Sequence, residues 1–341
     1  MKTQVVTIVA ATILAIVAGS QLMSENSTSQ NEQLSRQKFE NFVVSYGRKY
    51  ISPAEKEFRF KVFVQNLEEI VKINSANISY KYGLNNFSDM TQEEFKAKYL
   101  GYVSNKKESE LSAMNQHSLT SGPASVDWRT KGAVTPVKDQ GACGSCWAFA
   151  ATGALEGAYF LKNGSQLSFS EQHLVDCSWL QGNLGCSGGL ANRAFRYWEK
   201  KGFLKESDYE YTAKNGNCQY EKKKDLVVGK LSKFIQNGNT EDDLLESLVI
   251  APTAVAVNAT PLMKYSSGIY SDTTACPANF NDLNHAVLAV GYGADSAGNK
   301  FWIVKNSWGT SWGENGYFRL GRGVIAGGVC GVALDTSIAK L

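Results

Sequence analysis

Cysteine and histidine are the residue types best suited to nucleophilic chemistry, and this chain has seven cysteines and three histidines. Cys146 is the most informative of them, because it lies in the segment Gln140-Gly-Ala-Cys-Gly-Ser-Cys146-Trp147. A cysteine attacks as the thiolate, so a reactive cysteine needs surroundings that lower its pKa. The residues that follow Cys146 indicate one source of such an effect.

Residues 147–161 are rich in helix formers, and the pair Asn163-Gly164 is typical of a helix end. Unpaired N–H groups in the first turn of a helix favour a negative charge. We therefore expect Cys146 in the first turn of a long buried helix. Two other interpretations of Cys143-x-x-Cys146 are a zinc half-site and a thioredoxin-like redox pair. No second Cys-x-x-Cys exists for zinc, and no parallel-strand unit precedes the pair.

A cysteine nucleophile needs a base within hydrogen-bond reach, and that base needs an orienting group. His117 lies in a polar stretch and His173 in a short predicted helix. His285 opens the apolar run 285–290 directly after a loop, where a side chain would project from the end of a strand. A single histidine is more often structural, but its combination with Cys146 makes His285 the candidate base.

Asn306 is the candidate orienting group, because it ends the apolar strand predicted to pair with the strand of His285. Its amide oxygen could hold one imidazole nitrogen and leave the other facing the thiol. Trp308 would shield that bond from water. Without this context, Asn306 could simply be a turn residue before serine and glycine. His285 lies within the range of about 130–150 residues beyond Cys146 known for one class of cysteine enzyme, and Asn306 lies slightly beyond it.

The composition is that of a globular protein, with 341 residues, 43% hydrophobic, 20% charged and a formal net charge of +3. The chain has no block of five or six like charges, so its charge pattern does not suggest nucleic-acid binding. Lys2, the apolar run 5–19 and Ala18-Gly19-Ser20 predict a cleaved secretory signal over residues 1–20, too short to span a membrane. The mature protein should then be soluble in an oxidising compartment, where an odd number of cysteines leaves one thiol unpaired.

Helices are predicted between the signal peptide and a polar segment. The first carries an aromatic stripe of Phe39, Phe42, Tyr46 and Tyr50. The second follows Pro53, and its periodic residues are Glu55, Arg59, Phe63, Asn66, Ile70 and Asn74. Periodicity leaves open whether the second helix is plainly amphipathic or also hydrogen-bonds through this face. Thr91-x-x-Glu94 is a capping box. The polar segment 104–121 predicts an exposed, protease-sensitive linker.

Beyond residue 126 the pattern changes from mainly helical to mainly β. Helical patterns cover 168–177 and 190–201, whereas 253–257, 285–290 and 301–304 are short apolar strands. The turn-rich segment 291–299 should join the last two strands as a hairpin. We therefore expect a mainly helical lobe followed by a mainly β lobe.

Taken together, these motifs resemble papain-like cysteine proteases of the cathepsin L type, which are made as preproenzymes. The resemblance covers roughly residues 38–341. It rests on residues 128–149, Cys186-Ser-Gly-Gly189, Asn284-His-Ala286, residues 306–317, the ERFNIN-like helix after Pro53, and residues 83–89, which match the propeptide pattern Gly-x-Asn-x-Phe-x-Asp.

The resemblance implies an α+β, papain-like two-lobe fold, with a helical left lobe, a β-barrel-like right lobe and a cleft between them. A helical propeptide domain precedes this fold. The implied division is a signal peptide at 1–20, an inhibitory propeptide at 21–122, and a peptidase domain at 123–341. Within the propeptide, the helical part should cover about 36–100 and the linker about 101–122.

The resemblance also implies the roles of individual residues. Cys146 would be the nucleophile, His285 the acid and base, and Asn306 the orienting group. The Gln140 side chain and the Cys146 N–H would form the oxyanion hole. The implied substrate-binding residues are Gly188, Gly189, Leu190, Ala191, Ala256, Leu283, Ala286, Trp308 and Asp335, and the implied disulfides are Cys143–Cys186, Cys177–Cys218 and Cys276–Cys330.

Asp335 lies five residues past Cys330, the position that the resemblance gives to the base of the S2 pocket. An ordinary surface carboxylate is the equally open alternative. The small apolar S2 lining predicts leucine, phenylalanine or valine at P2, with arginine tolerated if Asp335 lies there. An endopeptidase is favoured, because the chain has no His-His pair for an occluding loop and no cysteine before Cys143 to tie a retained propeptide fragment.

The expected protein is therefore a secretory-pathway zymogen, lysosomal, vacuolar or extracellular, whose partners are protein and peptide substrates and its own propeptide. We expect a monomer without cofactor or metal, and without nucleic-acid or membrane binding after signal removal. The alternative is a non-catalytic, protease-like binding or inhibitory protein. Retention of Cys146, His285, Asn306 and Gln140 argues against that alternative.

Overall fold

A computed structural model of the chain describes residues 30–103 and 122–341. The predicted signal peptide 1–20, His117 and most of the predicted linker lie outside the described residues. The chain divides into two compact units, Met1–Glu69 and Ile70–Leu341. No helix in the described residues combines the length and apolar character needed to cross a membrane.

The first unit contains a helix over residues 30–45 and the first part of helix α2 (Pro53–Ser75). Phe39 and Phe42 pack against Phe63, with ring centroids 5.4 and 5.2 Å apart, which confirms the predicted aromatic stripe. The helix is shorter than the stripe, because the chain turns after residue 45. Tyr46 and Tyr50 therefore reach the same cluster from the turn and the loop beyond it.

The second unit begins with the end of α2, which leads into strand β1 (Tyr80–Tyr82). The Asn74 side chain donates to the Tyr82 carbonyl at 2.8 Å and accepts from the Tyr82 N–H at 2.9 Å. Ile70, on the same predicted face, is buried. This face of α2 therefore both packs and hydrogen-bonds, which decides between the two interpretations of its periodicity.

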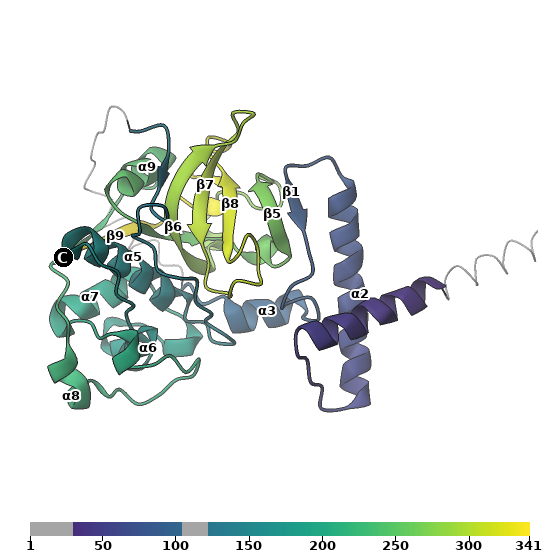
Figure 1. The fold of residues 1–341 in the computed structure, drawn as a ribbon, viewed down its shortest axis with the longest axis horizontal. Coiled ribbons are helices and arrows are strands. Elements are labelled where there is room, and N and C mark those ends of the chain that lie inside the picture. The colour runs from purple at the N-terminus through teal and green to yellow at the C-terminus, as the bar shows by residue number, and fades with distance from the viewer. Residues whose placement is uncertain (1–29, 104–121) are drawn as a thin grey trace, which may run out of the picture. The chain divides into compact units, whose positions relative to one another are not determined.

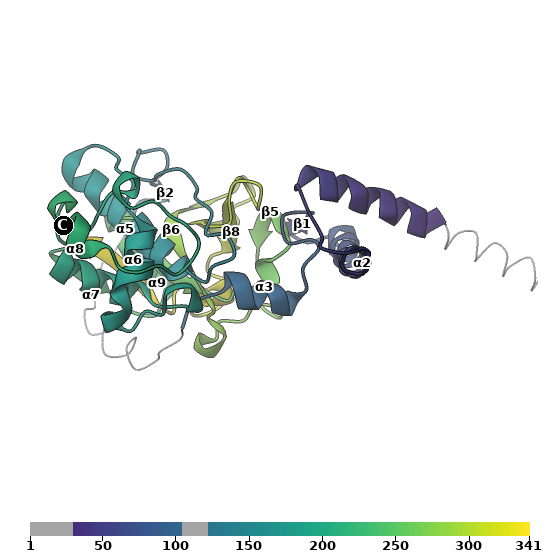
Figure 2. The same cartoon turned by 90° about the horizontal axis from the view of Figure 1, so that it is seen from below.

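Helix α3 (Gln92–Tyr99) begins at the predicted capping box. The Thr91 hydroxyl accepts from the Glu94 N–H at 3.2 Å, and the Glu94 carboxylate accepts from the Thr91 N–H at 3.0 Å. These bonds satisfy two of the backbone donors that every helix start leaves without an intrahelical partner. Figure 1 shows α3 below the lower ends of β7 and β8, and Figure 2, seen from below, shows it in front.

The helical part of the second unit is built around one long buried helix, as predicted. Helix α5 begins at Cys146 and ends at Asn163, and the capping residue Gly164 has a φ of 72°, which suits a glycine at a helix C-terminus. Its neighbours complete a hydrophobic cluster. The helices of this part are α5 (Cys146–Asn163), α6 (Glu171–Cys177), α7 (Ala191–Lys201) and α8 (Tyr220–Lys223), and α9 (Glu241–Ile250) lies farther along the chain.

The β part is one sheet with the strand order β1-β5-β8-β7-β6-β4-β9-β3, and β2 pairs with β6. Its strands after β1 are β2 (Val126–Asp127), β3 (Lys233–Gln236), β4 (Thr253–Val257), β5 (Tyr265–Tyr270), β6 (His285–Ala294), β7 (Lys300–Lys305), β8 (Tyr317–Gly321) and β9 (Thr336–Lys340). Short 3-10 helices cover Ser178–Gln181, Gly185–Ser187, Glu206–Asp208, Lys224–Leu226, Thr260–Leu262, Phe280–Asp282 and Val329–Gly331.

The predicted hairpin of β6 and β7 is confirmed, and its antiparallel register pairs Leu288 with Lys305. Helix α5 packs along β6, where a Cβ on Gly153 would lie 2.8 Å from a Leu288 methyl group. The small side chain at Gly153 therefore lets the helix approach the sheet closely. This contact brings the start of α5 near the start of β6, the two chain positions that matter for the site.

Three disulfides join Cys143 to Cys186, Cys177 to Cys218 and Cys276 to Cys330. The pairing is the one that the resemblance implied. All seven cysteines lie within the described residues, and Cys146 is the cysteine that remains free.

Candidate active site

Cys146 is the first residue of α5 and has no exposed surface. Its Sγ accepts a hydrogen bond from the Ala286 N–H at 3.4 Å. Ala286 directly follows His285 at the start of β6. The packing of α5 on β6 thus brings the sulfur to the residue next to His285, although the two residues are far apart in the chain.

His285 is also fully buried, and its Nε2 lies 2.8 Å from Asn306 Oδ1. The imidazole stacks on Trp308 with ring centroids 4.6 Å apart, which shields this hydrogen bond from water. Within the described residues, His285 Nδ1 has no hydrogen-bond partner. One ring nitrogen is therefore bound by Asn306 and the other remains available for proton transfer.

Burial controls the charges of both groups in this structure. Loss of hydration raises the pKa of Cys146 to about 11, although backbone N–H groups, including those of Ala286 and Gly101, act in the opposite direction. Loss of hydration lowers the pKa of His285 to about 4, against the effect of the Asn306 hydrogen bond. Near pH 7, the thiol and the imidazole are therefore both neutral while the site is covered.

Gln140 lies in the loop before α5. Its side-chain nitrogen donates to the Cys143 carbonyl at 2.8 Å and to the Tyr99 carbonyl at 2.9 Å. Ser307 donates to the Gln140 side-chain oxygen at 2.7 Å, which fixes the orientation of the amide. Gln140 is fully buried. One of the two carbonyls that accept from the Gln140 amide therefore belongs to the end of α3, 41 positions earlier in the chain.

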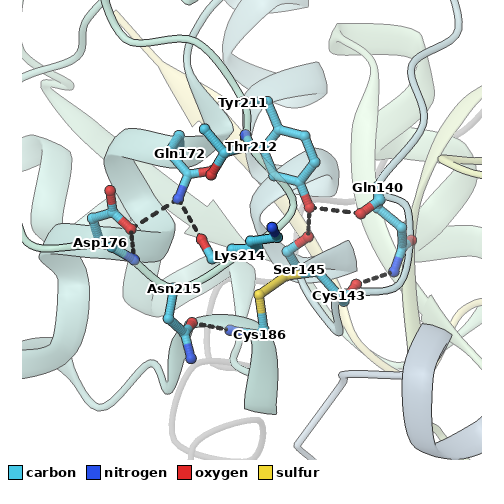
Figure 3. The surroundings of a disulfide bond; sticks show 12 residues. Gln140, Cys143, Ser145, Gln172, Asp176, Cys186, Tyr211, Thr212, Lys214 and Asn215 are labelled. Carbon is cyan, nitrogen blue, oxygen red and sulfur yellow. Dashed lines mark hydrogen bonds between the residues drawn. A yellow bond between two sulfur atoms is a disulfide. The ribbon is translucent and has the colours of Figure 1, made fainter.

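Figure 3 shows how the loop from Gln140 to Ser145 is held beside the disulfide of Cys143 and Cys186. The Tyr211 hydroxyl donates to the Gln140 carbonyl at 2.7 Å and lies 2.6 Å from the Ser145 hydroxyl. Sequence reasoning missed Tyr211, because nothing in its neighbourhood marks it. Ser307 could have been suspected from its position directly after Asn306.

The segment after α3 runs across these residues. Gly101 accepts from the Gly189 N–H at 2.9 Å, and Val103 donates to the Gly189 carbonyl at 3.3 Å. A Cβ on Gly101 would lie 1.9 Å from the Gly144 carbonyl oxygen, so this approach requires glycine. Residues 99–103 thus cover Cys146 and one side of the predicted substrate-binding region.

Trp308, predicted to bind substrate, is covered as well. Phe87 and Phe95 pack edge-on against the indole, with ring centroids 5.3 and 5.1 Å away. Both rings are buried, and both belong to the segment before residue 100. This aromatic contact anchors α3 beside the imidazole of His285.

Other predicted substrate-binding residues meet in the lining of one pocket. Asp335 lines this pocket and is therefore not an ordinary surface carboxylate. Leu190 and Leu283 are buried but are not among the lining residues. The lining residues are Tyr102, Ala191, Asn192, Ala254, Val255, Ala256, Ala286, Asp335 and Ser337.

Comparison with known families gives two matches along the chain. Residues 122–340 match the family described as papain family cysteine protease. Residues 39–95 match the cathepsin propeptide inhibitor domain. The two matches follow one another in the order expected of a zymogen.

Individual proteins are similar over most of their length. The chain is 44% identical over 304 residues to a cathepsin L-like proteinase of Fasciola hepatica, covering 87% of this chain and 90% of that protein. It is 42% identical over 310 residues to digestive cysteine proteinase 3 of Homarus americanus, covering 88% and 93%. The solved structure of digestive procathepsin L 3 from the Tenebrio molitor larval midgut is 39% identical, with a TM-score of 0.81, covering 90% and 99%.

Proposed function

Because this chain belongs to the papain family of cysteine proteases and carries a cathepsin-type propeptide, we propose that Cys146 and His285 hydrolyse peptide bonds in the mature enzyme. One observation carries this proposal. A free cysteine at the start of α5 accepts a hydrogen bond from the residue next to a histidine that Asn306 orients. This is the arrangement of nucleophile, base and orienting group that covalent catalysis by cysteine needs.

In the proposed reaction, the Cys146 thiolate attacks the carbonyl carbon of the substrate, and the carbonyl oxygen becomes an oxyanion. The Gln140 amide and the Cys146 N–H donate hydrogen bonds to that oxygen. His285 then protonates the amine as the C–N bond breaks, which leaves an acyl-enzyme. Water, deprotonated by His285, attacks the acyl carbon and releases the acid product and the thiol.

The contacts of residues 99–103 support an inhibitory role for the propeptide. The Tyr99 carbonyl accepts from the Gln140 amide, so a propeptide carbonyl occupies a proposed oxyanion donor. Gly101 lies against Cys146 and keeps substrate away from the sulfur. When this segment leaves, water and substrate enter, the cost of ionisation falls, and the thiolate–imidazolium pair forms. We propose that the mature enzyme begins near residues 122–124, after cleavage in the linker at low pH.

The proposed specificity follows from the pocket that contains Asp335. The methyl groups of Ala191, Ala256 and Ala286 favour leucine, phenylalanine or valine at P2, and Asp335 adds tolerance of arginine. Replacing Asp335 with alanine should lower the ratio of kcat/KM for P2-Arg over P2-Phe peptides. An unchanged ratio would remove Asp335 from the recognition of arginine. We further propose that the enzyme is an endopeptidase delivered through the secretory pathway.

A direct test compares the wild-type protein with Cys146→Ser after acid treatment. We expect the wild type to convert itself and to cleave a fluorogenic peptide with phenylalanine at P2. The serine variant should do neither. Because it cannot process itself, it is also trimmed with a small amount of wild-type enzyme, so that both proteins have the same N-terminus. Cleavage by the trimmed serine variant, beyond that of the added enzyme, would overturn the proposal.

A further inference from the structure

The pocket that contains Asp335 combines apolar walls with one charged acceptor. Alanines and a valine dominate its lining, which also contains the polar residues Asn192 and Ser337. Asp335 is the carboxylate among its lining residues. A cavity of this kind suits a ligand with an apolar body and a single hydrogen-bond donor at its tip.

The carboxylate of Asp335 is held in position by the sheet. The Gln236 side chain donates to Asp335 Oδ1 at 2.9 Å, and the Asp335 carbonyl accepts from the Ala256 N–H at 3.1 Å. Gln236 is itself buried and ends β3, where it pairs with Ser337 of β9. The two strands on either side of β9 therefore fix Asp335, so its carboxylate can offer the second oxygen to a ligand without reorganisation.

The propeptide already places a phenol in this pocket. Tyr102 is among the lining residues, and its hydroxyl donates to Asp335 Oδ2. The Tyr102 N–H donates to the Asn284 carbonyl at 3.0 Å, which anchors the main chain at Tyr102. The depth from this anchor to the carboxylate thus matches the length of a tyrosine side chain. A phenylalanine side chain in this place would lack the hydroxyl that reaches the carboxylate.

We propose that Asp335 and Gln236 form a receptor for a phenolic hydroxyl, which makes the mature enzyme prefer tyrosine over phenylalanine at P2. This inference rests on the proposed function and on the assignment of this pocket to P2. A phenylalanine ring would exclude water from the carboxylate without replacing its hydrogen bond. A site built to bind a hydroxyl discriminates against the analogue that lacks it for this reason. In the zymogen, the same receptor holds Tyr102.

The first experiment uses the mature wild-type enzyme and two peptides that differ only by tyrosine or phenylalanine at P2. We expect kcat/KM to favour the tyrosine peptide by about tenfold, as for a hydrogen bond to a charged group. Asp335→Ala should abolish this preference, because it removes the carboxylate that accepts a hydrogen bond from the hydroxyl. Asp242→Ala, which removes an exposed carboxylate from α9, is the matched control and should keep the preference.

The outcomes separate this inference from the proposed function. If the wild type cleaves neither peptide, the proposed function fails. If the wild type cleaves both peptides equally well, the function stands and the hydroxyl receptor is wrong. The wild-type comparison needs no variant, so it decides the question even if Asp335→Ala does not fold. A preference that survives in a folded Asp335→Ala enzyme would also overturn the assignment.

A second experiment tests the receptor in the full-length zymogen, without reference to P2. The rate at which iodoacetamide labels Cys146 near pH 8 reports how often the propeptide exposes the thiol. Tyr102→Phe and Asp335→Ala should each raise this rate about tenfold, and the double variant should be no faster than either single variant. Additive effects in the double variant would show that the two side chains act independently and would contradict the proposal.

Discussion

At the scale of single residues, the chemistry of the site depends on how much water reaches Cys146 and His285. The covered thiol has its pKa raised to about 11 and the covered imidazole has its pKa lowered to about 4. Both effects come first from burial and have the same consequence, because the neutral form of each group is favoured. The zymogen thus keeps the parts of the proposed machinery in place while it suppresses their charges.

This argument predicts different thiol reactivity in the two forms of the protein. A thiol with a pKa of about 11 is ionised to roughly one part in a thousand at pH 8, so iodoacetamide should label zymogen Cys146 very slowly. The mature enzyme should react at least about a hundredfold faster and keep this reactivity below pH 7. Equal labelling rates in the two forms would contradict the argument. Cys146→Ser identifies any label that goes to other residues.

At the scale of elements, α3 and the residues after it determine whether the site is covered. The helix begins at the Thr91 capping box and presents Phe95 to Trp308. Its last residue, Tyr99, places a carbonyl on Gln140. A weaker helix start should therefore loosen contacts at the other end of the same short element, which has only eight residues.

Replacing Thr91 with alanine removes the hydroxyl that accepts from the Glu94 N–H. The loss of such a cap costs about 1 kcal/mol, so acid-triggered processing of the zymogen should become about fivefold faster. Thr91→Ser keeps the hydroxyl and should process at close to the wild-type rate. The rate is measured by following the loss of the full-length band on gels. If the serine and alanine variants accelerate equally, the cap is not responsible.

At the scale of the whole molecule, the β part and the helical part of the second unit each contain a buried imidazole. His285 lies at the start of the β sheet, and His173 lies in α6 among aromatic rings. Burial lowers the pKa of His173 to about 3. Between pH 6.5 and 4, the unfolded chain therefore binds protons at both positions that the folded chain does not, and acid reduces the free energy of unfolding.

The contribution of His285 can be isolated in the Cys146→Ser zymogen, which cannot process itself. Below pH 6.5, and down to about pH 4, His285 should cost about 1.4 kcal/mol of unfolding free energy for each unit of acidification. Adding His285→Gln should remove that part of the pH dependence, because glutamine does not titrate. Urea unfolding of both proteins at pH 7.5, 5.5 and 4.5 provides the comparison. Parallel stability curves would show that the histidine is not responsible.

Much of the local structure could be predicted from the sequence, because short-range signals determine it. The run after Cys146 predicted α5 and its end, and Thr91 and Glu94 predicted a helix start. Two short apolar runs joined by a turn-rich segment predicted the hairpin of β6 and β7. The first aromatic stripe was also correct, but its helix ends at residue 45, before the last two rings. The periodicity of a stripe does not reveal where a turn replaces the helix.

The sequence by itself determined which residues could form the proposed catalytic site, because cysteine, histidine and asparagine have few other reasons to occur in these patterns. Tertiary structure alone decided which side chains surround them. Asp335 lines a pocket rather than the open surface, and Tyr102 reaches it from 233 positions away in the chain. Tyr211 holds the Gln140 loop from 71 positions away. Such contacts depend on how the helices and the sheet pack, and no local pattern of residues encodes that packing.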